Sequence, residues 1–392
     1  MERHVFSLCV SLLALAGPGL GGCVLVDKEV GSDGDSGAGE SDSEGEPSAA
    51  LGVPPEQLWS QDDPGMNVES VAAGEAGGVF IAGTLEVVTG TGLGVAVLES
   101  LSPADGSVLW SRTLEGPEDH YSVRVMSYQT DVLAVWDSHD SPLRAARYSA
   151  DGDLIWSTEL VADDSWWLAA AVVDAGGQVA IAGRSGGLDG AAKYAFVSTV
   201  DANNGAPGWT WSSDAGAEEA TAVGYIAQGT LAVVIQDGLD DTESYVIALG
   251  DGGVEESSFA LPTQPYPAGV RGIASLEGGP ALLVGHTRIE PTANVTSWLG
   301  WVSDGGIAAQ ETNVAEQTVW NMAFEVAAVQ GGFIVAGKVI EDPGAPLQGW
   351  LGAVDEDGTP LWTMTDVPGV ALAIGGDMIV TGARGHVEAR SF

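Results

Sequence analysis

The sequence predicts an all-β fold, a single seven-bladed β-propeller of four-stranded blades, from three observations. Short β-rich runs, most of them bounded by glycine, recur seven times along the 392 residues. Asp-Gly or Asn-Gly turns follow the first six runs at spacings of 46, 53, 47, 53 and 53 residues, a period typical of propeller blades. The two ends of the chain hold complementary parts of the seventh blade. Together these features favour a closed ring over a helical solenoid.

Residues 1–22 have the pattern of a signal peptide. A mostly apolar run from Val5 to Ala16 follows Arg3 and is too short for an ordinary transmembrane helix. The end of this segment, Leu20-Gly21-Gly22-Cys23, resembles the lipobox of bacterial lipoproteins. That resemblance implies acylation of Cys23, and therefore a membrane anchor outside the cytoplasm. An ordinary secretory peptide cleaved near Gly22 is the alternative.

Residues 23–50 form a predicted tether between this anchor and the propeller, which spans 51–392. Glycine, serine and eight carboxylates are set against the single Lys28, so the segment cannot bury enough apolar surface to order itself. The resemblance to lipoproteins also implies that Val24, rather than aspartate, after the cysteine favours sorting to the outer membrane where the enterobacterial rule applies, on its periplasmic or its outer side. The two cysteines, Cys9 and Cys23, leave no disulfide framework for the mature domain.

Each blade is marked by its second strand, a short β-rich run that most often ends in glycine. The seven runs are GGVFIAG (77–83), DVLAVWD (131–137), GGQVAIAG (176–183), GTLAVVIQ (229–236), GGPALLVG (278–285), GGFIVAG (331–337) and GDMIVTG (376–382). An apolar run precedes each of them and supplies the innermost strand. A third strand and an Asp-Gly or Asn-Gly turn follow the first six, and this order matches a four-stranded blade.

The last blade lacks its fourth strand, because the chain ends after a third strand at 386–391. Leu58-Trp59-Ser60 near the start matches Leu109-Trp110-Ser111 and Ile155-Trp156-Ser157 in the outer strands of other blades. We therefore expect the first ordered residues to complete the last blade. This closure leaves no incomplete sheet with an exposed edge.

The tryptophans divide into a repeating set and an irregular set. Trp59, Trp110, Trp156, Trp211 and Trp362 stand at matching positions in outer strands. A side chain that recurs once per blade is expected to pack between blades, whereas a ligand site would break the symmetry. Trp136, Trp166 and Trp167 lie outside this register, so they are the better candidates for an exposed contact.

The segments SPADGSVLW (102–110) and SADGDLIW (149–156) resemble the tryptophan-docking repeats of pyrroloquinoline-quinone-like propellers. This family includes quinoprotein dehydrogenases and the propeller lipoprotein of the outer-membrane assembly machine. In a quinoprotein, the resemblance implies a quinone and calcium in the central pocket. The predicted domain has seven blades and lacks the adjacent cysteines found in many quinoproteins. These two differences favour a binding or scaffolding module. A quinoprotein-like or other propeller enzyme with a site in the central funnel is the alternative.

Charge excludes some partners and suggests others. The formal net charge of −42 opposes binding to nucleic acid and to anionic lipid surfaces. We use the name long-loop face for the side of the propeller that carries the connections between blades and between second and third strands; it holds most of the loop carboxylates. The residues predicted to bind there are Asp163, Asp164, Trp166, Trp167, Asp237, Asp240, Asp241 and Glu243. We expect a basic envelope protein or a cation such as calcium as the ligand, and the sequence requires no cofactor or catalytic residue.

Overall fold

The computed structural model describes residues 51–74, 77–86, 94–114, 120–138, 142–161, 166–186, 194–213, 218–227, 230–237, 244–261, 267–276, 281–288, 295–303, 306–311, 320–340, 348–367 and 371–392. All of these lie within one compact unit, Ser48–Phe392. The predicted signal peptide, the tether and Cys23 lie outside the described residues, so their assignment stays a prediction.

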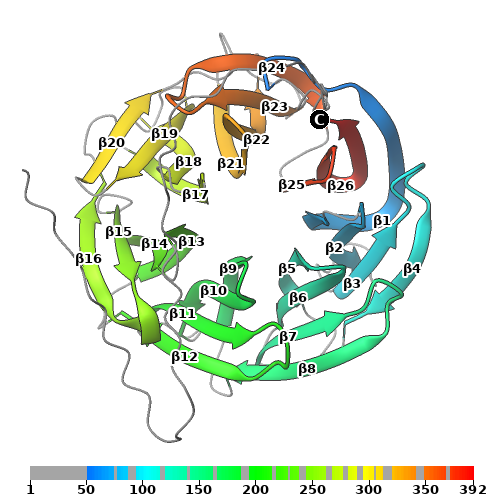
Figure 1. Cartoon of the computed structure of the whole chain (residues 1–392), viewed down its shortest axis with the longest axis horizontal. Helices are drawn as coiled ribbons and strands as arrows, with labels where there is room; N and C mark the ends of the chain where they lie inside the picture. The colour runs from blue at the N-terminus through cyan, green and yellow to red at the C-terminus, as the bar shows by residue number, and fades with distance from the viewer. Residues whose placement is uncertain are drawn as a thin grey trace, which may run out of the picture. The chain divides into compact units, whose positions relative to one another are not determined.

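The described strands form seven antiparallel blades of four strands each around a central axis, as predicted (Figure 1). The first three blades consist of the second half of β1 (Gln57–Ala73) with β2 (Val79–Glu86), β3 (Gly94–Leu101) and β4 (Val108–Thr113); β5 (His120–Tyr128), β6 (Asp131–Ser138), β7 (Leu143–Tyr148) and β8 (Leu154–Val161); and β9 (Trp166–Val173), β10 (Gln178–Ser185), β11 (Tyr194–Asp201) and β12 (Pro207–Ser212).

Blades 4 to 6 consist of β13 (Glu218–Ala227), β14 (Thr230–Asp237), β15 (Ser244–Leu249) and β16 (Glu255–Ala260), with the short helix η1 (Asp251–Gly253) in the last turn; β17 (Pro267–Ser275), β18 (Ala281–Arg288), β19 (Val295–Ser303) and β20 (Gly306–Glu311); and β21 (Trp320–Val329), β22 (Gly332–Ile340), β23 (Gln348–Asp355) and β24 (Pro360–Val367). Blade 7 combines β25 (Ala371–Gly375) and the two halves of β26 (Met378–Ser391) with the first half of β1.

The ring closes where the two ends of the propeller pair. The first half of β1 runs antiparallel to the second half of β26, with Trp59 opposite Ala389 and Ser60 opposite Glu388. The second half of β1 continues into blade 1, because Val71 pairs with Ile81 of β2. This confirms the predicted completion of the last blade by an N-terminal strand. The innermost strands contact one another in sequence around the axis, and β25 contacts β1.

The core lies in the seams between blades rather than in one central mass. Seven apolar clusters are present among the described residues, and each joins side chains of two neighbouring blades. Trp136 belongs to the cluster between blades 1 and 2 and is only 2% exposed. The prediction of an exposed contact at Trp136 was therefore wrong. Its ring fills a seam at a second-strand position where blade 1 has Gly83.

Most of the repeating tryptophans dock onto the next tight turn, which confirms their predicted packing role. Trp59 donates from Nε1 to the carbonyl oxygen of Pro103 at 2.9 Å, and a Cβ added at Gly106 would lie 2.6 Å from its ring. Gly106 has a φ of +73°, so the turn favours glycine for its backbone as well as for space. The same Nε1 bond joins Trp110 to Ala150, Trp156 to Ala202 and Trp362 to Leu51, at 2.7, 2.9 and 2.6 Å.

Blade 3 departs from the sequence-based alignment of these tryptophans. A Cβ at Gly253 would lie 2.6 Å from the ring of Trp209, so Trp209 and not Trp211 docks onto the turn of blade 4. Trp209 follows the turn glycine Gly205 by four residues, as Trp110 follows Gly106 and Trp156 follows Gly152. The spacing from the turn glycine therefore identifies the docking residue, and the alignment of Trp211 with this set was wrong.

The recurring glycine of the second strand has a steric cause. In blades 1, 3, 5 and 6 the innermost strand contains a β-bulge, and its register shifts at Glu69, Ala169, Arg271 and Phe324. Just before each bulge, a backbone carbonyl approaches the second strand so closely that a Cβ there would collide with it. The colliding pairs are Gly83 with Asn67, Gly183 with Trp167, Gly285 with Gly269 and Gly337 with Met322. In these four blades the glycines therefore leave room for the carbonyl that precedes the bulge.

Candidate functional site

The residues predicted to bind on the long-loop face are only partly described. Asp163, Asp164, Asp240, Asp241 and Glu243 lie outside the described residues, as do the side chains of Trp166 and Asp237 at the ends of β9 and β14. Trp167 is described, and its side chain is 44% exposed. The structure thus leaves the predicted set as a prediction, with Trp167 as its exposed member among the described side chains.

Trp167 lies beside a polar seam between blades 3 and 4. The guanidinium of Arg184 lies 5.0 Å from the centre of the Trp167 ring, and its NH1 lies 3.5 Å from Oε2 of Glu219. The hydroxyl of Tyr245 donates to Oε1 of Glu218 at 2.9 Å. Glu218 and Glu219, at the start of β13, are therefore both engaged within the propeller.

Two further carboxylates of that face connect blades instead of facing a partner. Glu69 of blade 1 accepts hydrogen bonds from the hydroxyl of Thr84 and, at 3.2 Å, from the backbone N–H of Val123 in blade 2. Asp137 of blade 2 is fully buried, and its two oxygens accept from the N–H groups of Ser122 and of Leu168 in blade 3, each at 2.7 Å. Each carboxylate satisfies a backbone donor at the start of the next blade.

Burial raises the pKa of both groups. Loss of solvent raises the pKa of Asp137 to about 6, although its two backbone hydrogen bonds and the nearby Arg124 lower it. Burial also raises the pKa of Glu69, and Thr84, Arg124 and Val123 oppose that rise. These two carboxylates therefore belong to the framework around Arg124 and not to the exposed acidity.

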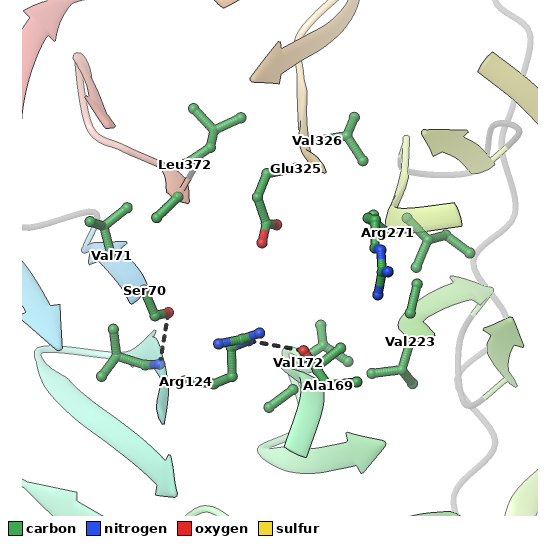
Figure 2. Close-up of a pocket in the computed structure, with 17 residues that line it drawn as sticks. Ser70, Val71, Arg124, Ala169, Val172, Val223, Arg271, Glu325, Val326 and Leu372 are labelled. Atoms are coloured by element: carbon green, nitrogen blue, oxygen red, sulfur yellow. Dashed lines mark hydrogen bonds between the residues drawn. The ribbon is translucent and has the colours of Figure 1, made fainter. Parts of the chain in front are cut away.

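The innermost strands surround a central cavity of about 190 Å³, to which all seven of them contribute (Figure 2). Strand register identifies two rings of equivalent residues in its wall. The apolar ring contains Val71, Val125, Ala171, Val223, Ile273 and Val326. The preceding position of each strand forms the mixed ring: Ser70, Arg124, Ala170, Ala222, Gly272, Glu325 and Leu372. The apolar ring repeats one kind of side chain, whereas the mixed ring does not.

Arg124 is held in place on the cavity wall. Its Nε donates to the carbonyl oxygen of Ala169 in the next blade at 3.0 Å (Figure 2). Its NH1 donates to the hydroxyl of Ser122 at 3.1 Å and to its neighbouring carbonyl, that of Val123, at 2.9 Å. The remaining guanidinium nitrogen, NH2, has no hydrogen bond to a described residue, so it can still donate to a ligand.

Arg271 and Glu325 complete the charged part of the cavity. Arg271 is the extra residue of the bulge in β17, between Val270 and Gly272, and its side chain is exposed toward the cavity. Glu325 is half-buried and points toward the middle of the ring (Figure 2). Burial raises the pKa of Glu325 to about 7, against the lowering effect of Arg124. Neither side chain makes a hydrogen bond or ion pair with a described residue.

A site in the central funnel was predicted only as an alternative and without its residues, although the sequence contains a signal for two of them. The innermost strands were identified as apolar runs, and YSVRVMSY (121–128) and NMAFEVAA (321–328) each carry one charge within such a run. A charge at an otherwise apolar position of a repeat marks a break in symmetry. The bulge that makes Arg271 an extra residue has no comparable signal, because it depends on pairing with β18.

The residues present do not fit a quinone and calcium in this cavity. Calcium binds roughly six to eight oxygen ligands. The charged residues of the cavity are two arginines, which repel a cation, and a single glutamate. Across the described ranges, no group of three or more His, Cys, Asp or Glu side chains is placed to hold a metal ion.

None of the helices in the described part of the chain is long and apolar enough to cross a membrane.

Comparisons with known proteins identify the fold and not a family. No protein-family model matches the chain, and no curated protein matches its sequence. Among solved structures, an acylaminoacyl peptidase of Pyrococcus horikoshii aligns with a TM-score of 0.54 and 8% identity, over 85% of this chain and 54% of the peptidase. This chain therefore spans about half the length of that enzyme.

Two other propellers align over most of their own length. The β-propeller domain of the trilobed protease from Pyrococcus furiosus, which has an open velcro topology, gives a TM-score of 0.51 and 9% identity over 82% of this chain and 94% of the domain. Sqt1 from Chaetomium thermophilum gives a TM-score of 0.51 and 11% identity, over 86% of this chain and 99% of Sqt1. At such identities the likeness shows the propeller fold alone.

Proposed function

We propose that this chain is a lipid-anchored binding module of the bacterial cell envelope, which holds a basic protein partner on its long-loop face. The observation that carries the proposal is Trp167, a large aromatic side chain that is 44% exposed at the start of the innermost strand β9. Exposed tryptophans are enriched at the centres of protein interfaces.

Charge supports a basic partner. The sequence between β8 and β9 contains Asp163 and Asp164, and that between β14 and β15 contains Asp240, Asp241 and Glu243. In the sequence, the first segment directly precedes β9, which carries Trp167, and the second connects two strands of the following blade. An acidic surface around an aromatic anchor attracts a basic partner and speeds its association.

The anchor is supported by the lipobox-like Leu20-Gly21-Gly22-Cys23 and by the acidic tether that follows it. The tether would hold the propeller away from the membrane surface. Metabolic labelling with an alkyne palmitate tests this part directly. We expect label on the wild-type protein and none on Cys23→Ser, and equal labelling of the two would refute the anchor.

A capture experiment tests the binding surface. The intact lipoprotein in detergent is compared with a variant that carries Trp167→Ala, Asp240→Asn and Asp241→Asn. A matched control carries Glu255→Gln and Glu256→Gln on the exposed outer strand β16, with the same change of two charges. We expect a basic envelope protein to be retained by the wild type and the control and lost by the variant. A partner retained by all three, or an acidic partner, would contradict the proposal.

A further inference from the structure

The mixed ring of the central cavity departs from the seven-fold repetition of the propeller. The docking tryptophans and the apolar ring recur at equivalent positions of several blades. The equivalent positions of the mixed ring hold arginine in blade 2, glutamate in blade 6 and small or apolar residues elsewhere. Arg124 bonds to Ala169 of the next blade through Nε, but Arg271 and Glu325 make no hydrogen bond or ion pair with a described residue, so contacts between blades do not account for these two charges.

The charge of the cavity is opposite to that of the chain. Only 13 lysines and arginines stand against 55 acidic residues in the sequence, yet two of the three charged cavity residues are arginines. Arg271 makes no hydrogen bond or ion pair among the described residues, and Arg124 retains an uncommitted NH2. Glu325 offsets part of this positive charge, and its raised pKa near 7 reduces that offset at neutral pH.

The two rings give the cavity a polar end and an apolar end. Each innermost strand starts at the long-loop face, so Arg271 lies between the mixed ring and that face. Val125, Val223 and Val326 belong to the apolar ring on the opposite side. The volume of about 190 Å³ accommodates a ligand of roughly ten non-hydrogen atoms, since one water needs about 10 to 15 Å³ on the same measure.

We propose that this central cavity binds a small organic carboxylate, which places its charged group against Arg271 and Arg124 and its apolar body against the apolar ring. Two guanidinium groups supply charge-assisted donors of the geometry that suits a carboxylate. An apolar wall with few polar groups is typical of small-molecule sites. The site is separate from the proposed partner surface, because Trp167 does not line the cavity.

Calorimetric titration of the full chain with benzoate tests the proposal. Benzamide has the same shape without the charge, and inorganic phosphate has charge without an apolar body. We expect benzoate to bind the wild type at one site, and benzamide and phosphate to bind at least tenfold more weakly. The proposal is overturned if benzoate does not bind, or if either control ligand binds equally well.

Two variants connect the binding to the cavity. Arg271→Gln should weaken benzoate binding at least tenfold, whereas Arg184→Gln, which removes an arginine outside the cavity, should leave it within twofold. Glu325→Gln should tighten binding several-fold, because it removes the negative charge beside the ligand. Unchanged affinity in both Arg271→Gln and Glu325→Gln would refute the site. If Arg271→Gln does not fold, Glu325→Gln decides: unchanged or weaker binding refutes the proposal.

Discussion

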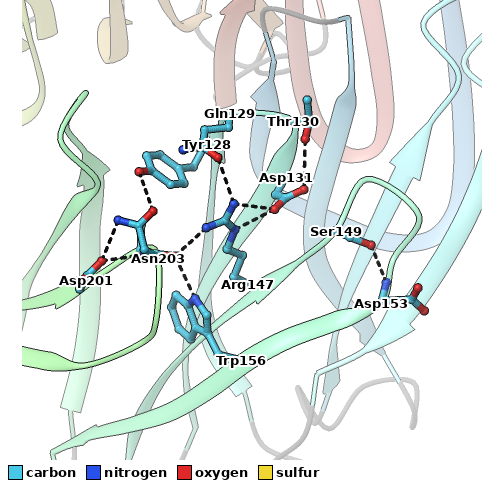
Figure 3. Close-up of polar contacts among 11 residues, drawn as sticks. Tyr128, Gln129, Thr130, Asp131, Arg147, Ser149, Asp153, Trp156, Asp201 and Asn203 are labelled. Carbon is cyan, nitrogen blue, oxygen red and sulfur yellow. Dashed lines mark hydrogen bonds and ion pairs between the residues drawn. The ribbon is translucent and has the colours of Figure 1, made fainter.

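Two arginines of this propeller lie in different surroundings. Arg147 on β7 is 9% exposed in the seam between blades 2 and 3, and Arg271 lies in the central cavity. The Nε of Arg147 donates to Asp131 at 2.8 Å and its NH1 to the carbonyl of Ala202 at 3.1 Å (Figure 3). Arg271 has no such partner among the described residues. The difference separates a charge that the fold requires from one that remains free for a ligand.

The surroundings of Arg147 show what complete engagement involves. Its NH2 lies 2.7 Å from Asp131 Oδ2, and its guanidinium lies 5.0 Å from the centre of the Tyr128 ring. Ala202 accepts from Trp156 as well, so the arginine and the docking tryptophan share one carbonyl (Figure 3). Burying a charge is costly unless it is paired and hydrogen-bonded, and Arg147 meets both conditions.

Removal of Arg147 should have the largest effect on stability. Arg147→Ala leaves Asp131 buried without its ionic partner, so we expect the free energy of unfolding to fall by about 3 to 5 kcal/mol in urea titrations. Arg144→Ala removes a partly exposed partner of Glu159 and should cost about 0 to 1 kcal/mol. Equal losses of stability in the two variants would contradict a larger contribution of the buried Arg147–Asp131 pair than of the partly exposed Arg144–Glu159 pair.

Glu325 should make stability depend on pH. Its pKa is raised from 4.5 to about 7, so the folded protein holds this proton more tightly than the unfolded chain does. Its favourable contribution is present below pH 4.5 and is lost as the pH rises to about 7 and beyond. Relative to Glu325→Gln, the wild type should therefore lose stability over this range, by an amount on the order of 3 kcal/mol. A difference between the two proteins that stays constant from pH 4 to 8 would contradict this assignment.

Neighbouring glycines in one turn can isolate the contribution of tryptophan docking. Gly252 and Gly253 have φ of +73° and +74°, but only a Cβ at Gly253 meets a tryptophan ring, that of Trp209. Both alanine variants incur backbone strain, and Gly253→Ala should cost about 1 to 3 kcal/mol more. Thermal and urea unfolding of the pair measure this difference. Equal stability would show that the contact with Trp209 contributes little.

The sequence predicts the parts of this fold that repeat. Glycine-bounded runs, Asp-Gly turns and outer-strand tryptophans recur because each blade meets the same steric demand from its neighbour. What the sequence did not predict depends on pairing between strands. A seam buries Trp136, and a bulge makes Arg271 an extra residue near the axis. Short motifs contain no information on these two features. Trp209, in contrast, is detectable in the sequence, because it follows Gly205 by the four residues that separate Trp110 from Gly106.

The smallest expected effect on stability is at Trp167. Trp167→Ala removes a side chain that is 44% exposed, and we expect the free energy of unfolding to change by no more than about 0.5 kcal/mol. Trp156→Ala, which removes a docked tryptophan, should cost more than about 2 kcal/mol. Comparable losses in the two variants would place Trp167 in the framework and weaken its role as a contact for a partner.

The free energy of unfolding of Arg271→Gln, measured in urea with and without benzoate, tests most directly whether the charges of the cavity serve binding rather than folding. Without benzoate, the variant should match the wild type within about 0.5 kcal/mol. With benzoate, the wild type should gain stability by mass action and the variant should gain little. A variant as unstable as Arg147→Ala, or one that gains as much from benzoate as the wild type, would contradict this account.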